Sequence, residues 1–229
     1  GVPQLLTHEA ISAVRDPDPR SFRSYDPEAI ARYYRWRIWG TGWRVVQILW
    51  WLGTFVLGLQ LDRWFHREER NKQRRASQLR QVLTDLGPTF IKVGQALSTR
   101  PDLVRKDFLE ELTKLQDQLP PFPTPLARAI IEAELDYTPE EIFSIISPEP
   151  VAAASLGQVY KARLFSGEEV AVKVQRPNLR PVLTRDLYLM RWAANWLGRF
   201  LPLNLGHDLT LIVDEFGIKL FEEIDYLHE

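Results

Sequence analysis

Lys173 is the residue of this chain with the clearest potential for chemistry. It ends the run Val170-Ala171-Val172-Lys173, and Val174 follows it. Because side chains alternate along a strand, Lys173 should point to the side opposite Val172 and Val174. An ammonium group there could bind a phosphate as a point charge. Taken alone, however, a lysine on a strand is more often a solvated or edge residue.

A loop of small residues precedes Lys173, at the position where a phosphate-binding loop would carry glycines. It consists of Ala152, Ala153, Ala154 and Ser155. Glycine lets the backbone approach a phosphate closely and adopt positive φ. Alanine still permits a close approach, but its Cβ forbids much of that φ range. A phosphate could bind in a different pose, although the three alanines alone are better explained as a tight packing turn.

The order of strand, loop, strand and lysine matches the nucleotide site of a kinase. There the lysine pairs with the α- and β-phosphates and with a glutamate on a helix. A kinase also needs a catalytic-loop aspartate, an asparagine and a metal-binding aspartate further along the chain. None is present before Glu229, which falls inside a helical pattern. We therefore expect a piece of a longer protein, with the Mg²⁺ ligands downstream and no catalytic residue assignable here.

Two other groups of polar residues are candidates for function. Lys92 and Gln95 are three residues apart and share a helix face, while Gly94 lacks a Cβ and should admit a neighbouring backbone. Taken alone, this is an ordinary helix containing a glycine. The second group is acidic and lies on one amphipathic helix; its usual explanation is a solvated acidic face. Its members are Glu223, Asp225 and Glu229.

Composition limits the classes of function. The 229 residues are 45% apolar and 26% charged, enough for one large domain or two small ones. The formal net charge of −1 predicts no nucleic-acid partner. The absence of cysteine excludes disulfides and thiolate chemistry, and the four histidines lack the spacing of metal ligands. We expect no metal site in this chain.

The first part of the chain, residues 1–74, contains an uncharged stretch, Val45–Leu61. It is short for a membrane span and interrupted by Gln47 and Gln60. Nearby aromatic and basic residues favour a helix lying on a membrane surface. A helix buried on the domain is an open alternative, and a true span is the least favoured. These aromatic and basic residues, within the stretch or beside it, are Trp43, Trp50, Trp51, Trp64, Arg32, Arg35, Arg37 and Arg44.

Residues 75–147 are predicted to be helical, with only helices and their joints up to about Ile146. Gly87 should end one helix and Pro88 begin the next, and a capping box starts at Thr138. Residues 148–229 contain two β-rich runs joined by a hairpin signal at Phe165–Glu168. The predicted fold class is therefore α+β, a helical N-terminal extension followed by a small antiparallel sheet with helices.

Together, four segments resemble the UbiB-like (aarF-domain, ADCK) atypical kinases. The segment LGPTFIKVGQALSTRPDL is similar to the KxGQ signature of that family, and PVAAASLGQVYKA to its alanine-rich loop. VAVKVQRP is similar to its lysine strand, and FEEIDYLHE to its ExD-containing helix. The resemblance covers roughly residues 75–229, and the combination is more specific than any single motif. The tryptophan-rich leader looks like the cyanobacterial and chloroplast branch.

The resemblance implies a partial kinase-like N-lobe that binds ATP or ADP through the alanine loop and Lys173, with Glu229 as the helix partner of the lysine. Glu223 and Asp225 would face Lys92 and Gln95; the roles of Glu229 and Glu223 could be exchanged. In that family the alanine loop is thought to alter nucleotide handling, and the KxGQ helix to occlude the peptide-substrate site.

The activity implied is that of an ATPase or small-molecule kinase at a membrane, supporting isoprenoid-quinone or related lipid metabolism. The partners implied are a membrane surface and an isoprenoid lipid or quinone precursor, at a thylakoid or plastoglobule. The alternative is a lipid- or protein-binding scaffold with a vestigial nucleotide site. The sequence leaves the substrate and the oligomeric state open.

Overall fold

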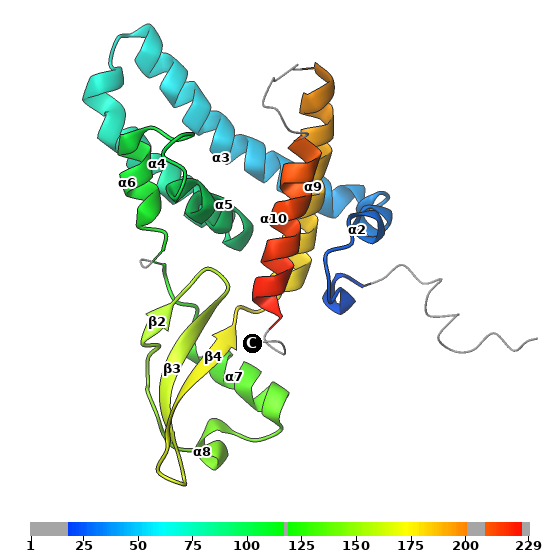
Figure 1. Ribbon diagram of the computed structural model, residues 1–229, viewed down its shortest axis with the longest axis vertical. Helices are drawn as coiled ribbons and strands as arrows, with labels where there is room; N and C mark the ends of the chain where they lie inside the picture. Colours follow the sequence, from blue (N-terminus) through cyan, green and yellow to red (C-terminus); the bar gives the residue numbers. More distant parts are fainter. Residues whose placement is uncertain (1–17, 117–118, 201–208, 226–229) are drawn as a thin grey trace, which may run out of the picture. The chain divides into compact units, whose positions relative to one another are not determined.

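The computed structural model describes residues 18–116, 119–200 and 209–225, and the chain divides into two compact units (Figure 1). One unit combines the part up to Val45 with the part from Arg180 onward, and the other is Val46–Leu179. Helix α3 (Ile38–Trp64) begins in the first unit and ends in the second.

The first unit is helical. It contains the 3₁₀ turn η1 (Pro19–Ser21), α2 (Pro27–Tyr34), the start of α3, α9 (Leu179–Phe200) and α10 (Leu209–Ile224). Helix α2 begins where it does because the Asp26 carboxylate accepts hydrogen bonds from the backbone N–H groups of Glu28 and Ala29. Pro27 occupies the first helical position, where its missing N–H is not needed.

A buried ion pair joins α3 to α9 within this unit. Arg44 donates from Nε to Asp186 Oδ1 at 2.8 Å and from Nη2 to Oδ2 at 2.7 Å. The two side chains are 6% and 0% exposed. Beside the pair, the Tyr34 hydroxyl lies 3.1 Å from the Thr184 hydroxyl. The bidentate geometry fixes both the distance and the orientation of the two helices.

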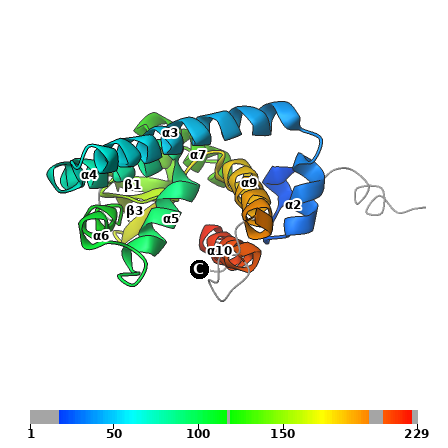
Figure 2. The same cartoon turned by 90° about the horizontal axis from the view of Figure 1, so that it is seen from above.

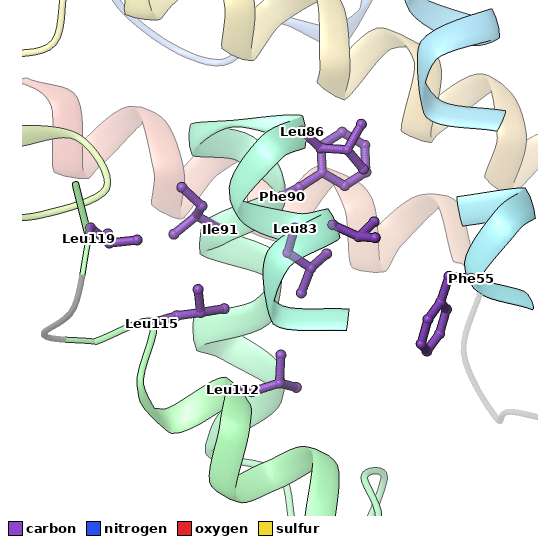
Figure 3. Packing of buried hydrophobic residues seen from close by; sticks show 9 residues of the cluster. Phe55, Leu83, Leu86, Phe90, Ile91, Leu112, Leu115 and Leu119 are labelled. Carbon is purple, nitrogen blue, oxygen red and sulfur yellow. The ribbon is translucent and has the colours of Figure 1, made fainter. Parts of the chain in front are cut away.

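The second unit contains a helical cluster built on the rest of α3. Its helices are α4 (Glu68–Leu86), α5 (Pro88–Ser98) and α6 (Lys106–Thr113). Gly87, at φ 96°, ends α4, and Pro88 begins α5, as predicted. Figure 3 shows how the leucine and aromatic side chains of these helices meet in one core. The core residues are Phe55, Val82, Leu83, Leu86, Phe90, Ile91, Leu112, Leu115 and Leu119.

A small antiparallel sheet forms the other part of the second unit, and the predicted α+β class is confirmed (Figure 2). Its strands are β1 (Phe143–Ile146), β2 (Ala152–Ala153), β3 (Gly157–Leu164) and β4 (Glu169–Gln175). β3 is central, because it pairs with all three other strands. Two helices accompany the sheet, α7 (Thr124–Leu135) and α8 (Pro139–Ile142).

One face of this sheet packs on α7. Tyr160, Ala162 and Val174 point into a core that also contains Ile131 of α7. Lys173, between Val172 and Val174, is exposed, so the predicted alternation along β4 is confirmed. The predicted hairpin turn between β3 and β4 is also present: Gly167 adopts φ 91°, and its N–H donates to Leu164 O at 3.0 Å.

The expectation of helices alone up to Ile146 is wrong. The capping box at Thr138 is present as predicted, but α8 is only one turn long and Phe143 continues directly into β1. Phe143 pairs with Leu164 and Ile146 with Ala162 of β3. This strand is specified by the neighbouring β3, a tertiary contact that overrides the local helical pattern.

Helix α3 presents apolar side chains to the outside. Among the described residues it is the one helix long and apolar enough to cross a membrane by length and composition, and 17% of its most apolar window is buried. Val46, Trp50, Leu57 and Trp64 follow at helical spacing and are 50–80% exposed. Trp51 instead packs against the core of α4, α5 and α6. The outward side is thus a continuous apolar stripe.

Asp186→Ala should destabilise the chain by about 3–5 kcal/mol, because it leaves the buried Arg44 guanidinium without its carboxylate. The measurement is equilibrium unfolding in urea. Asp102→Ala is the matched control, since Asp102 pairs with Arg100 at the surface, where both side chains are more than half exposed. The control should unfold nearly as the parent does. Equal unfolding midpoints for the two variants would contradict this role of the Arg44–Asp186 pair.

Candidate nucleotide site

The alanine loop is the end of a strand followed by a tight turn. Ala152 pairs with Val159 and Ala153 with Gln158, and the Ala154 N–H donates to Gly157 O at 2.8 Å. None of the loop residues is among the described residues with positive φ. The backbone therefore follows a path that alanine adopts without strain, and it needs no glycine.

Lys173 lies two strands away from the loop in the same row of the sheet. Val159 of β3 pairs with Ala152 on one side and with Lys173 on the other. Residues in one row point to the same face, and neighbouring strands are about 4.8 Å apart, so the loop and the lysine backbone are roughly 10 Å apart. This face is opposite the one that packs on α7. The geometry brings the predicted loop and the predicted lysine together on an exposed face.

Arg176, which the sequence analysis did not single out, holds the loop in place. Its Nε donates to Ala154 O at 3.3 Å, and its backbone N–H donates to Leu156 O at 2.9 Å. Its Nη2 donates to Pro120 O at 2.8 Å, and the guanidinium lies 5.6 Å from the centre of the Phe122 ring. Burial lowers the pKa of Arg176 from its ordinary value. The arginine thus connects the turn to the segment that enters α7.

Gln158 makes a second connection to the same segment. Its Oε1 accepts from Phe122 N at 3.0 Å, and its Nε2 donates to Phe122 O at 3.1 Å and to the Tyr160 hydroxyl at 2.6 Å. Gln158 is 1% exposed. A buried amide needs such partners, because an unpaired one would destabilise the fold. Its position beside Tyr160 on β3, among apolar residues, was the available sequence signal.

Gln95 connects the helical cluster to the loop. From α5 its Nε2 donates to Leu115 O at 2.7 Å, and its Oε1 accepts from the Ser155 hydroxyl at 3.5 Å. Both Gln95 and Ser155 are buried. The predicted KxGQ glutamine therefore contacts the alanine loop at Ser155. Lys92, on the same helix, is half-buried.

Gly94 admits leucine side chains, and the expectation of a neighbouring backbone is wrong. A Cβ at this position would lie 2.5 Å from Leu115 Cδ1 and 2.8 Å from Leu83 Cδ1. The glycine is needed because Leu83 of α4, Leu112 of α6 and Leu115 just after α6 pack over it.

The acidic residues of the predicted site belong to the other unit. Glu223 is exposed near the end of α10, and Asp225 follows it half-buried, whereas Lys92, Gln95 and Lys173 lie within Val46–Leu179. The pairing of Glu223 and Asp225 with the KxGQ helix stays a prediction. Glu229 lies outside the described residues, so its pairing with Lys173 also stays a prediction.

The described residues contain no group of three histidine, aspartate or glutamate side chains arranged to hold a metal ion. Two cavities, of about 280 and 470 Å³, are lined by residues of α3, α4 and α6 and by no residue of the alanine loop. The candidate site is therefore an open sheet face carrying a loop and a lysine.

Comparison with known proteins identifies the family. The family profile described as the ABC1 atypical kinase-like domain matches residues 114–229, which include the sheet, the loop and Lys173. This chain belongs to the ABC1 atypical kinase-like family.

Its relatives are cyanobacterial and chloroplast proteins. An uncharacterized protein of Synechocystis is 66% identical over 209 residues, covering 91% of this chain and 37% of the relative. The Arabidopsis thaliana protein ACTIVITY OF BC1 COMPLEX KINASE 3, chloroplastic, is 47% identical over 206 residues, covering 90% of this chain and 29% of the relative. ACTIVITY OF BC1 COMPLEX KINASE 1, chloroplastic, of the same plant is 48% identical over 212 residues, covering 91% of this chain and 31% of the relative. The chain spans about a third of the length of these relatives.

Gly94→Ala should lower the free energy of unfolding by about 1–3 kcal/mol, because the added methyl overpacks the leucines of the core. Gly53→Ala is the matched control: Gly53 is also inside a helix, but a Cβ there meets nothing within 4 Å. That change should stabilise the chain by up to about 1 kcal/mol. The measurement is urea unfolding of both variants. If Gly94→Ala stabilised the chain as Gly53→Ala does, the absence of a side chain at Gly94 would not be required for packing the leucines.

Proposed function

We propose that this chain is the N-terminal part of a membrane-associated atypical kinase or ATPase that binds ATP or ADP through its alanine loop and Lys173. The observation that carries the proposal is the row Ala152–Val159–Lys173, which sets the loop and the lysine on the same exposed face of the sheet. The loop and the lysine backbone are roughly 10 Å apart, and the side chain of Lys173 extends from its strand, so the two can contact one polyphosphate placed between them. Membership of an atypical kinase-like family supports this use of the face.

The contacts behind the loop support a fixed nucleotide-binding surface. Arg176 bonds the turn at Ala154, Gln158 bonds the neighbouring strand to Phe122, and Gln95 bonds α5 to Ser155 of the loop. A loop held in one conformation binds a phosphate without first losing conformational entropy. Alanine in place of glycine adds to this by narrowing the accessible φ range.

The remaining parts of the proposal concern the whole protein. Catalytic-loop and metal-binding residues, with Mg²⁺, would come from a region outside this chain, which spans about a third of the length of its relatives. The substrate class would be an isoprenoid lipid or quinone precursor at a thylakoid or plastoglobule membrane, which agrees with chloroplastic relatives. The outward stripe of α3 would provide the membrane contact. The second candidate, a scaffold with a vestigial nucleotide site, rests on the alanines of the loop.

Lys173→Ala in the full-length protein should weaken ATP and ADP binding by about tenfold to a hundredfold, the value of a charge-assisted hydrogen bond to phosphate. Stability should change little, because the side chain is exposed. The measurement is nucleotide titration by calorimetry. Lys161→Ala is the control, since Lys161 is an exposed lysine on the adjacent strand that pairs with Glu169. Unchanged affinity in Lys173→Ala would contradict the site, and absence of nucleotide binding in the parent would favour the scaffold.

A double variant, Trp50→Ser with Leu57→Ser, should bind phosphatidylcholine vesicles more than tenfold more weakly than the parent, since each side chain contributes about 2 kcal/mol when buried in lipid. Sedimentation with vesicles measures this binding. The control changes Leu103 and Phe165 to serine in the same way; these side chains are 61% and 70% exposed and lie outside α3. Equal loss in both variants would exclude α3 as the contact. Retention of the parent through a carbonate wash would show a span.

A further inference from the structure

A group of three arginines lies at the start of α4, away from the proposed nucleotide site. Arg67, Arg70 and Arg74 follow one another at spacings of three and four residues, so they share one side of the helix. All three are exposed, and within the described part of the chain none of them forms an ion pair. We call these residues the arginine cluster. The acidic residues that begin α4, Glu68 and Glu69, face other directions around the helix.

The arginine cluster lines a hollow of about 470 Å³ between the end of α3 and the start of α4. The hollow has one carboxylate, Asp62, which is already bonded to its neighbours. Arg75 Nε donates to Asp62 Oδ2 at 2.5 Å, and Asn71 Nδ2 donates to Oδ1 at 2.7 Å. The bond from Arg75 lowers the pKa of Asp62, so this carboxylate stays ionised and occupied. Asp62 attracts Arg74 through space but forms no ion pair with any of the three arginines, so most of the positive charge of the cluster is not neutralised from within.

A second cavity at the same corner has a different character. It measures about 280 Å³ and is lined by Lys72 and Arg105, among others. Lys72 pairs with Glu69 at 2.8 Å, and Arg105 pairs with Asp107 at 2.5 Å. Lys72 and Arg105 thus have their own carboxylates, and Glu68 lines the cavity together with Arg63, so the excess of positive charge at this corner is greatest in the arginine cluster.

The hollow opens onto the apolar stripe of α3. Leu61 and Phe65 line it and are 41% and 60% exposed, and Trp64 beside them is 79% exposed. The Arg67 guanidinium lies 5.4 Å from the centre of the Phe65 ring. Apolar and aromatic side chains bordered by arginines are what the boundary between lipid tails and headgroups selects.

We propose that the arginine cluster binds the phosphate groups of anionic lipid headgroups while the stripe of α3 enters the tails. One guanidinium group can bind two oxygens of the same phosphate. Three guanidinium groups on one side of a helix can therefore hold more than one headgroup. The chain has a net charge of −1, so attraction to an anionic surface must come from a local group of cations. The inference rests on the proposed membrane contact of α3 and adds the class of lipid that it selects.

The test compares the full chain with the triple variant Arg67→Gln, Arg70→Gln, Arg74→Gln. The probes are vesicles of phosphatidylcholine alone and of equal parts phosphatidylcholine and phosphatidylglycerol. The variant should bind the anionic vesicles roughly a hundredfold more weakly, since each arginine near the surface contributes about fivefold, and should bind the neutral vesicles as the parent does. Added salt should weaken the binding of the parent to anionic vesicles and have little effect on the binding of the variant.

Two further variants serve as controls. Replacing the same arginines with lysine keeps the charge and should restore most of the binding. Arg20→Gln, Arg23→Gln, Lys219→Gln removes the same charge from exposed positions elsewhere and should bind nearly as the parent. The side chains changed are all exposed, and unchanged thermal unfolding confirms that each variant folds.

The outcomes separate this inference from the proposed function. Equal binding of anionic vesicles by the parent and the glutamine variant would contradict the role of the arginine cluster, but it would not contradict the proposed membrane contact of α3. Equal loss in the Arg20, Arg23, Lys219 variant also overturns it, because the effect is then one of total charge. A parent that binds neither vesicle overturns both proposals. Cluster-dependent binding of single-stranded DNA without vesicle binding would assign the arginines to nucleic acid instead.

Discussion

The position of the alanine loop depends on the hydrogen bonds that Gln158 and Arg176 make to one short segment, Pro120–Phe122. Gln158 bonds both the N–H and the carbonyl group of Phe122, and Arg176 bonds the carbonyls of Pro120 and Ala154. The Gln158–Phe122 bonds are buried, where an unmade hydrogen bond destabilises more than a made one stabilises, whereas the two Arg176 bonds are exposed. Together these bonds tie the loop and β3 to the segment that enters α7.

The two faces of the sheet differ in what lies against them. The face carrying Tyr160 and Val174 is filled by α7, and its residues serve packing. The opposite face carries Ala152, Val159 and Lys173 in one row, the row to which we assign the nucleotide. Gln95 extends the support to the helical cluster through Ser155. A change in the packing of α5, for example around Gly94, would therefore reach the loop through a single hydrogen bond.

Local signals in the sequence predicted the parts of this structure that local physics decides. The alternation around Lys173, the turn at Gly167 and the caps at Gly87 and Thr138 each depend on a few neighbouring residues. β1 escaped prediction because Phe143–Ile146 becomes a strand only beside β3. The roles of Arg176 and Gln158 escaped it because their partners in the Pro120–Phe122 segment lie 56 and 36 residues away along the chain. The neighbour of Gly94 was also wrongly predicted, since a glycine does not reveal whether backbone or side chain fills its space.

The central claim is that nucleotide occupies the sheet face between the alanine loop and Lys173. Amide hydrogen exchange of the full-length protein, with and without ATP and ADP, tests it most directly, because exchange locates the binding without any substitution. We expect nucleotide to slow exchange in Ala152–Gly157 and in β4 around Lys173, and to leave the α3–α4 corner unchanged. Exchange that is slowed elsewhere, with the loop and β4 unaffected at saturating nucleotide, would contradict it.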